Sequence, residues 1–222
     1  MRSIFLQLKI VLFIMAITIV APGFTYQHAK LLIIGDSISI GYTPYEKKTL
    51  ADKADVIHCK GNAKYTANGL QHLDEWLGDE KWDIIQFNWG LWDLCYRNPD
   101  LDEVPANRDK INGTITTSLE QYQANLEAIV KRLKQTKAKL VFVTTTYVPE
   151  NEPGRYDRDV ESYNDIAKKV MQANGVGVID IYPLSKEIHQ QDGLGNNNVH
   201  YTDEGYRKLS DEICKEVKNL LN

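Results

Sequence analysis

The 222-residue chain has few cysteines, no long basic cluster and no apolar run long enough to span a bilayer. Its three cysteines, Cys59, Cys95 and Cys214, fit no zinc-binding spacing and leave at least one thiol unpaired. A disulfide between Cys59 and Cys95 is one possibility in an oxidising compartment, whereas Cys214 is expected to be a small buried side chain. A formal net charge of −4 without a Lys/Arg cluster argues against nucleic acid as a partner.

Motifs for bound cofactors are also missing. No group of His, Cys, Asp and Glu has metal-ligand spacing, and no glycine fingerprint for a nucleotide is present. Internal repeats and low-complexity segments are absent as well. The remaining composition, 43% hydrophobic and 25% charged, suits one globular domain with a substantial core and no cofactor.

The first 29 residues differ from the rest. Arg2 and Lys9 precede an apolar run from Ile10 to Ala21, which Pro22 and Gly23 end. A basic start, a short apolar core and small residues after it predict a secretory signal. The run is short for a spanning helix, which needs about 20 apolar residues. An uncleaved N-terminal anchor is the alternative, because no clean Ala-x-Ala cleavage site is visible. Either interpretation places the domain, residues 30–222, outside the cytoplasm, and it contacts a membrane only if the segment stays uncleaved.

Strand and helix patterns alternate along the domain. Short apolar segments predict strands at 31–34, 55–59, 83–87, 139–144 and 177–181. Helical patterns fall at 44–54, 70–77, 119–135, 160–174 and 203–221. This alternation predicts right-handed crossovers and a parallel sheet covered on both faces, a three-layer α/β/α sandwich. The irregular stretches 89–113 and 147–157 follow strand ends and should shape a pocket there.

The most informative segment runs from Lys30 to Tyr42 and reads Lys-Leu-Leu-Ile-Ile-Gly-Asp-Ser-Ile-Ser-Ile-Gly-Tyr. Ser37 lies where the first strand gives way to a helical segment, at the carboxyl edge of the predicted sheet, where open α/β folds bind ligands. Backbone N–H groups of the following helical turn point toward any anion formed there. Gly35 permits the tight backbone path before the serine. Ser37 is therefore the candidate nucleophile.

A serine hydroxyl needs an adjacent base to attack an ester. Among the five histidines, His200 stands just before a predicted helix, with Thr202 as a reasonable N-cap and Asp203 in the first turn. This places its ring in a loop at the sheet edge, within reach of Ser37. The other four histidines are expected to be structural.

The Gly-Asp-Ser motif together with the late His-Tyr-Thr-Asp-Glu-Gly-Tyr resembles the SGNH (GDSL-type) hydrolase family of serine esterases and lipases. The resemblance runs from about Lys30 to the C-terminus. It implies five strands in flavodoxin-like order, an acyl-enzyme on Ser37 and His200 as the base. Among family members, the chain is most similar to carbohydrate O-acetylesterases.

The third catalytic position departs from the family pattern. The family usually has Asp three residues before the histidine, and that position here is Asn197. Three explanations stay open: a Ser–His dyad helped by Asn197 or a backbone carbonyl, a role for Asp192 through the Gly193-Leu194-Gly195 loop, or a weak or inactive member.

The oxyanion hole departs from the pattern as well. The Ser37 N–H is one candidate donor. The resemblance implies a glycine donor in the family's second conserved block, which matches residues 59–66 here; Gly61 is the only glycine there, although strict spacing selects Ala63. The third block normally reads Gly-x-Asn-Asp and is Gly90-Leu91-Trp92-Asp93 here, so Trp92 occupies the asparagine position. Asn88 is the nearer substitute unless it only caps a turn.

Several other side chains are candidate substrate contacts. Trp89 and Trp92 follow a strand end, where they could stack on sugar rings or pack as core. Arg155 and Arg158 could bind a substrate carboxylate or be solvated. The sequence thus predicts an exported ester hydrolase that deacetylates an O-acetylated glycan. Lipid or thioester cleavage, or a weakened glycan-binding accessory domain, are the alternatives.

Overall fold

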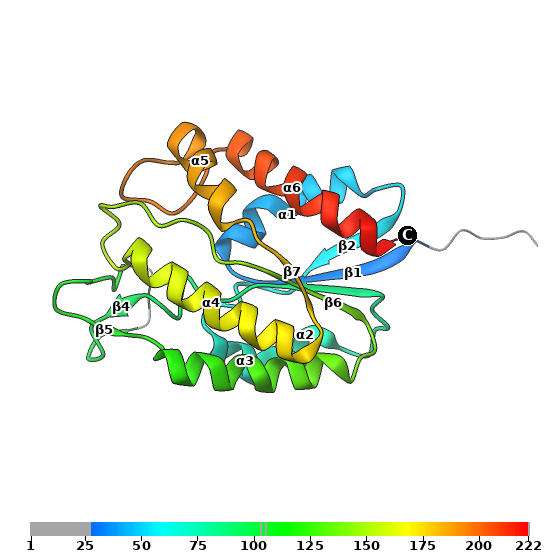
Figure 1. The fold of residues 1–222 in the computed structure, drawn as a ribbon, viewed down its shortest axis with the longest axis horizontal. Helices are drawn as coiled ribbons and strands as arrows, with labels where there is room; N and C mark the ends of the chain where they lie inside the picture. The colour runs from blue at the N-terminus through cyan, green and yellow to red at the C-terminus, as the bar shows by residue number, and fades with distance from the viewer. Residues whose placement is uncertain (1–27, 103, 105, 222) are drawn as a thin grey trace, which may run out of the picture.

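A computed structural model describes residues 28–102, 104 and 106–221 of the chain (Figure 1). Apart from His28 and Ala29, the expected export segment lies outside these residues, and Ala29 already belongs to the first strand. In the described part of the chain, no helix has both the length and the apolar character needed to traverse a bilayer.

The core of the fold is a parallel sheet of five strands in the order β2-β1-β3-β6-β7. The strands are β1 Ala29–Ile34, β2 Ala54–His58, β3 Ile84–Phe87, β6 Lys139–Val143 and β7 Gly177–Ile179. All four pairings between neighbours are parallel. The predicted flavodoxin-like order is confirmed, and all five strands form close to the predicted positions.

Burial follows the position of each strand in the sheet. The interior strand β1 carries Leu31 to Ile34, which are all buried because helices cover both faces of the sheet. In the edge strand β2, buried Ala54 and Val56 alternate with exposed Asp55 and Ile57. The apolar run before Ser37 is therefore a rigid element on which the serine is held.

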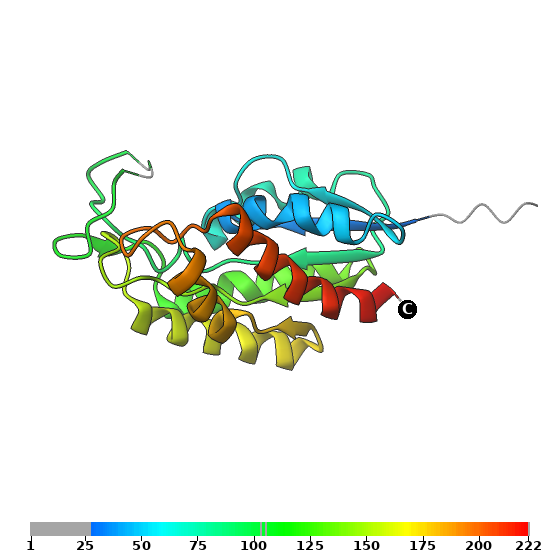
Figure 2. The same cartoon turned by 90° about the horizontal axis from the view of Figure 1, so that it is seen from above.

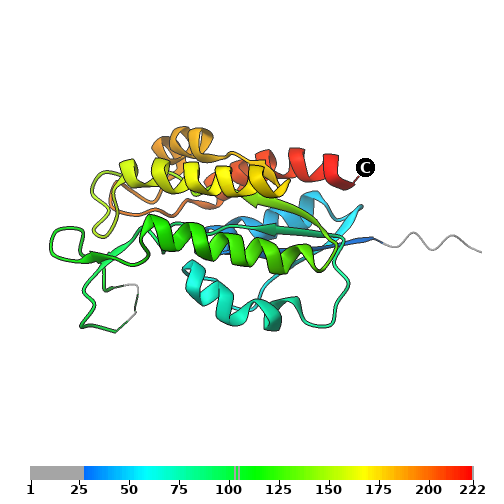
Figure 3. The same cartoon turned by 60° about the horizontal axis from the view of Figure 1, so that its bottom comes forward.

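Helices form two layers, one on each face of the sheet (Figures 1 and 3). The first layer contains α1 Ser37–Thr49, α5 Tyr182–Asp192 and α6 Asp203–Leu221. The second contains α2 Thr66–Leu77, α3 Leu119–Lys134 and α4 Asp157–Asn174. The structure thus confirms the three-layer α/β/α sandwich.

Helix α1 differs from the prediction because it begins at Ser37 rather than at residue 44. The Asp36 carboxylate caps it by accepting a hydrogen bond from the N–H of Ile38 at 3.0 Å. Pro44 consequently lies inside the helix. Gly41 allows α1 to approach α6 closely, because a Cβ at this position would lie 2.3 Å from the Tyr206 ring.

Helix α5 was not predicted from the sequence. Pro183 stands in its first turn, where a missing N–H costs nothing. Its surface is mostly polar, so it lacks the apolar periodicity of the longer helices. It carries the chain from β7 to the loop that holds His200.

The carboxyl ends of the strands meet at one end of the molecule, opposite the end where the chain enters β1 (Figures 1 and 2). The described residues of the irregular stretches 89–113 and 147–157 lie at this end. The first contains β4 Tyr96–Arg97, which pairs antiparallel with β5 Thr114–Ile115 just after it. These loops enclose the space above Ser37.

All three cysteines are buried free thiols, so the Cys59–Cys95 disulfide does not form. Burial raises the pKa of Cys59 to about 11 and that of Cys214 to about 12. The thiols are therefore protonated at neutral pH and pack as small apolar groups.

Candidate active site

Ser37 is the first residue of α1 and follows β1 directly. Its side chain is half-buried just beyond the carboxyl end of β1. Gly35 allows the sharp path into the helix, because a Cβ there would lie 2.6 Å from the Ser39 hydroxyl. The hydroxyl of Ser37 is thereby held at the mouth of a cavity, next to the N-terminus of a helix.

His200 approaches Ser37 from the loop between α5 and α6. Its Nε2 lies 2.9 Å from the Ser37 Oγ. Backbone hydrogen bonds hold this loop, from the N–H of Leu194 to the His200 carbonyl and from the N–H of Thr202 to the Asp192 carbonyl. The structure therefore brings the expected nucleophile and base into hydrogen-bond contact.

Asn198 orients the His200 ring. Its Oδ1 lies 2.7 Å from Nδ1 and also accepts a hydrogen bond from the His200 backbone N–H at 3.1 Å. The backbone N–H can only donate, so it fixes the oxygen of the amide on this side. An oxygen at this position selects the tautomer with a proton on Nδ1, which leaves Nε2 free to accept the serine proton.

These contacts correct the expectation for Asn197. The structure places Asn197 on the surface, and the adjacent Asn198 occupies the orienting position instead. Asp192 does not supply a charge there, because its carboxylate accepts a hydrogen bond from Lys208 at 2.7 Å. The orienting residue thus stands two positions before His200 rather than three, and from there its amide oxygen contacts both the ring and the backbone N–H of His200.

A second serine–histidine pair lies below the first. The Ser39 Oγ is 2.7 Å from the His58 Nε2, and the His58 Nδ1 faces the Cys59 carbonyl at 2.8 Å. Ser39 is 1% exposed, and its hydroxyl also lies within hydrogen-bond distance of the Asp36 carbonyl. Since substrate has no access to it, this pair ties α1 to β2 and is not a second nucleophilic site.

The oxyanion donors differ in part from the expectation. The N–H of Ser37, at the first helical position, is among those that a helix leaves unpaired. Ala63 is unsuited because its N–H donates to the Gly35 carbonyl at 2.9 Å. Gly61 is exposed at φ +79°, whereas the adjacent Asn62 lines the cavity. The Asn62 Oδ1 accepts from a backbone N–H, which leaves its amide NH₂ group to donate.

The structure gives Asn88 a structural contact, which corrects the expectation of an oxyanion donor. Its amide donates to the Val143 carbonyl at 2.8 Å and links the ends of β3 and β6. Asp93, in the same motif block, is fully buried and accepts two hydrogen bonds from Thr66 at the start of α2. Burial raises its pKa to about 7.

The two tryptophans have different environments. Trp89 is fully buried, and its indole N–H donates to the Ala63 carbonyl, so it belongs to the core and not to a substrate surface. This corrects one of the two expected substrate contacts. Trp92 lines the cavity, and the Arg97 guanidinium lies 4.6 Å from its ring centroid.

A cavity of about 180 Å³ lies beside the catalytic pair. Arg97, Arg108 and Arg155 contribute to its lining together with Ser37 and His200. Burial lowers the pKa of His200, and the positive charges of Arg155 and Arg108 lower it further. His200 is therefore neutral, the form that accepts a proton, at lower pH than an ordinary histidine.

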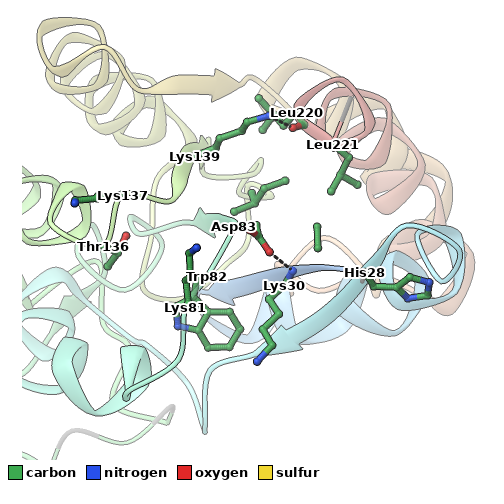
Figure 4. A pocket seen from close by; sticks show the side chains of 12 residues that line it. His28, Lys30, Lys81, Trp82, Asp83, Thr136, Lys137, Lys139, Leu220 and Leu221 are labelled. Atoms are coloured by element: carbon green, nitrogen blue, oxygen red, sulfur yellow. Dashed lines mark hydrogen bonds between the residues drawn. The ribbon is translucent and has the colours of Figure 1, made fainter. Parts of the chain in front are cut away.

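A larger hollow lies at the opposite end of the sheet (Figure 4). Its volume is about 650 Å³, and its lining includes Lys30, Lys81, Trp82 and Lys139. It contains no serine or cysteine and lies at the amino ends of the strands, where α/β sheets rarely bind substrate. Among the described residues, no cluster of His, Cys, Asp and Glu could hold a metal ion.

Four polar residues of the site were not predicted from the sequence: Asn62, Arg97, Arg108 and Asn198. Asn198 stands in an Asn-Asn-Asn run in which spacing alone favoured its neighbour. Asn62 was detectable as the polar residue that follows Gly61. Arg108 had no local signal, because a long irregular loop brings it to the cavity.

Comparison with known proteins places the chain in a family. The GDSL-like Lipase/Acylhydrolase family matches residues 33–208, which include both Ser37 and His200. No curated protein matches the sequence.

Solved structures share the fold at low identity. The acetyl xylan esterase AlAXEase is 18% identical, with a TM-score of 0.68 over 85% of this chain and 99% of its own. A lipase/acylhydrolase from Enterococcus faecalis is 21% identical, with a TM-score of 0.67 over 86% and 96%. Axe2, an acetylxylan esterase from Geobacillus stearothermophilus, is 18% identical, with a TM-score of 0.66 over 85% and 94%. The chain therefore belongs to the GDSL-like lipase/acylhydrolase family, whose members are carboxylic ester hydrolases.

Proposed function

We propose that this protein is an exported serine esterase that removes acetyl groups from an O-acetylated glycan through an acyl-enzyme on Ser37. The observation that carries the proposal is the hydrogen-bonded series from the Ser37 Oγ to His200, at 2.9 Å, and from His200 to Asn198, at 2.7 Å. In this order the amide fixes the ring tautomer and the ring activates the serine.

The reaction proceeds in two steps. His200 Nε2 takes the proton of Ser37 as its oxygen attacks the ester carbonyl, and the N–H of Ser37 and the amide of Asn62 stabilise the oxyanion. His200 then gives the proton to the leaving alcohol, which breaks the ester bond and leaves acetyl-Ser37. Water, deprotonated by His200, attacks the acyl-enzyme, and acetate leaves as Ser37 regains its proton.

The cavity favours a short acyl group on a polar alcohol. A volume of about 180 Å³ with three arginines in its lining suits an acetyl group better than a long fatty acyl chain. Trp92 adds a largely buried aromatic wall to the same cavity, with the Arg97 guanidinium over its ring. Two of the structural neighbours are described as acetyl xylan esterases, which agrees with this substrate class.

Serine labelling tests the nucleophile. The domain should react with a fluorophosphonate at Ser37 and hydrolyse p-nitrophenyl acetate, and Ser37→Ala should abolish both. Ser39→Ala is the matched control, since it removes a hydroxyl two residues away in the same helix but outside the cavity. It should label normally. Labelling that persists in folded Ser37→Ala would refute the assignment.

Substrate class and export are tested separately. Acetate release from O-acetylated xylan should exceed hydrolysis of a long-chain p-nitrophenyl ester, and the reverse order would favour the lipase alternative. Glycan binding without labelling or turnover would favour an accessory domain. For export, the N-terminal sequence of the mature protein should begin near residue 29, and a chain retained in the cytoplasm would contradict this part of the proposal.

A further inference from the structure

Two arginines beside the catalytic pair share one carboxylate. Arg108 Nη1 and Arg155 Nη1 both donate to the Glu152 Oε1, at 3.0 Å and 2.8 Å. Glu152 is completely buried, and its other oxygen accepts from the Gly154 N–H. The Nε of Arg155 donates to the Leu91 carbonyl. One carboxylate therefore holds two guanidinium groups in fixed orientations, and their charges exceed its own.

In both Arg108 and Arg155, the terminal nitrogen Nη2 is available to donate hydrogen bonds to a ligand. Among the described residues, neither Nη2 group has a hydrogen-bond partner, and neither is fully enclosed. The Arg155 side chain is only 6% exposed, so its open group is directed at the cavity that both arginines line. The Nε of Arg108 is enclosed without a partner.

The cavity lining carries more positive than negative side-chain charges. Three arginines, Arg97, Arg108 and Arg155, line the cavity with a single acidic side chain, Asp36. Burial raises the pKa of Asp36, which opposes its negative charge. Burial lowers the pKa of His200, and the charges of Arg155 and Arg108 lower it further, as expected beside a positively charged lining.

From this geometry we infer that Arg108 and Arg155 form a carboxylate-binding subsite beside Ser37, so that the preferred substrate is an O-acetylated sugar acid. A planar carboxylate matches the donor pattern of guanidinium groups, and arginines that are already held in place lose little entropy on binding it. This inference rests on the proposed esterase function and narrows its substrate to uronic-acid-type glycans. Arg158, in the first turn of α4, stacks on Tyr156 outside the cavity and is mostly exposed.

The test measures acetate release from two substrates, an O-acetylated galacturonate and its methyl ester, in which the methyl group removes the negative charge of the sugar acid. The wild-type protein should prefer the acid, and Arg108→Gln should lower the acid-to-ester ratio of kcat/KM by about 10- to 100-fold, chiefly through KM. Arg158→Gln is the matched control, because it removes the same charge outside the cavity and should leave the ratio near that of the wild type. Arg108 is preferred to Arg155 because it is partly exposed, whereas Arg155 also holds a loop carbonyl.

Equal losses on both substrates in Arg108→Gln would overturn the inference, since the arginine would then act on the transition state rather than on the substrate anion. A wild-type preference for the methyl ester would overturn it as well. Calorimetry of galacturonate binding to Ser37→Ala provides a readout that needs no turnover. Binding that Arg108→Gln weakens would support the subsite even if the esterase proposal failed, and absence of binding together with a ratio near one would refute it.

Discussion

Replacing Asn198 with aspartate should raise activity, because among the described residues no carboxylate contacts the His200 ring. The Asn198 Oδ1 lies 2.7 Å from His200 Nδ1, so a carboxylate there would face the imidazolium directly as it forms. Two unit charges about 4 Å apart attract each other by about 4 kcal/mol at an effective dielectric constant of 20. Enclosing the new carboxylate offsets part of this energy.

The expected gain in kcat/KM is about 10- to 100-fold, or about 1.4–2.7 kcal/mol of transition-state stabilisation. It should be smaller than the factor of about 10⁴ that separates Asp from Asn in a serine protease, where the amide selects the wrong tautomer. Here the backbone N–H of His200 already orients the amide oxygen toward the ring. The remaining deficit is therefore the missing charge.

The assay is the pH dependence of kcat/KM on p-nitrophenyl acetate. The pKa of His200 is lowered in the native site by burial and by Arg155 and Arg108, so the acid limb should lie below 6.5. Asn198→Asp should move this limb upward because a neighbouring carboxylate favours the charged ring. Asn197→Asp, an equal charge change at the exposed neighbour, should move it little. A rise in Asn197→Asp but not in folded Asn198→Asp would refute the assignment.

Two further predictions concern stability. Glu46 is buried against Gln86, and burial raises its pKa from 4.5 to about 8. Because the folded state holds this proton more tightly, the stabilisation from Glu46 is complete below pH 4.5 and is lost as pH rises through 8. Glu46→Gln should therefore be more stable than the wild type at pH 9 by about 1–3 kcal/mol. Melting temperatures of the two proteins that change in parallel from pH 5 to 9 would contradict this. Gly41→Ala should destabilise by about 1–3 kcal/mol despite its better helix propensity, because its Cβ meets the Tyr206 ring. In a Tyr206→Ala background Gly41→Ala should cost little, and melts that show no loss in the single variant would oppose the reasoning.

The sheet was predictable because its strands can be recognised from their own local sequence. Strands buried on both faces need continuous apolar runs, as in Leu31 to Ile34, and few other elements use such short runs. The start of α1 was missed because Pro44 is typical of a first turn, whereas the true cap is Asp36. At this site the capping carboxylate was hidden inside the catalytic motif.

The site was predictable only where it is built from motif residues on regular elements. Ser37 and His200 sit next to a strand end and a helix start, so their meeting follows from the topology. The prediction for Asn197 was wrong because the backbone path of the loop, which spacing alone does not give, points the neighbouring Asn198 side chain at the ring. Asn88 failed because its partner, the Val143 carbonyl, comes from another strand end and leaves no trace in the local sequence.

The amide at Asn198 and the arginine pair fit together electrostatically. A carboxylate next to His200 would give Arg108 and Arg155 a second internal anion and weaken their hold on a substrate carboxylate. With an amide there, the ring keeps its tautomer while the positive potential stays available to the substrate. An acidic substrate would then bring part of the missing negative charge to the site itself. It follows that Asn198→Asp should accelerate hydrolysis of the neutral methyl ester more than that of the sugar acid. A larger gain on the acid would show that the two features act independently.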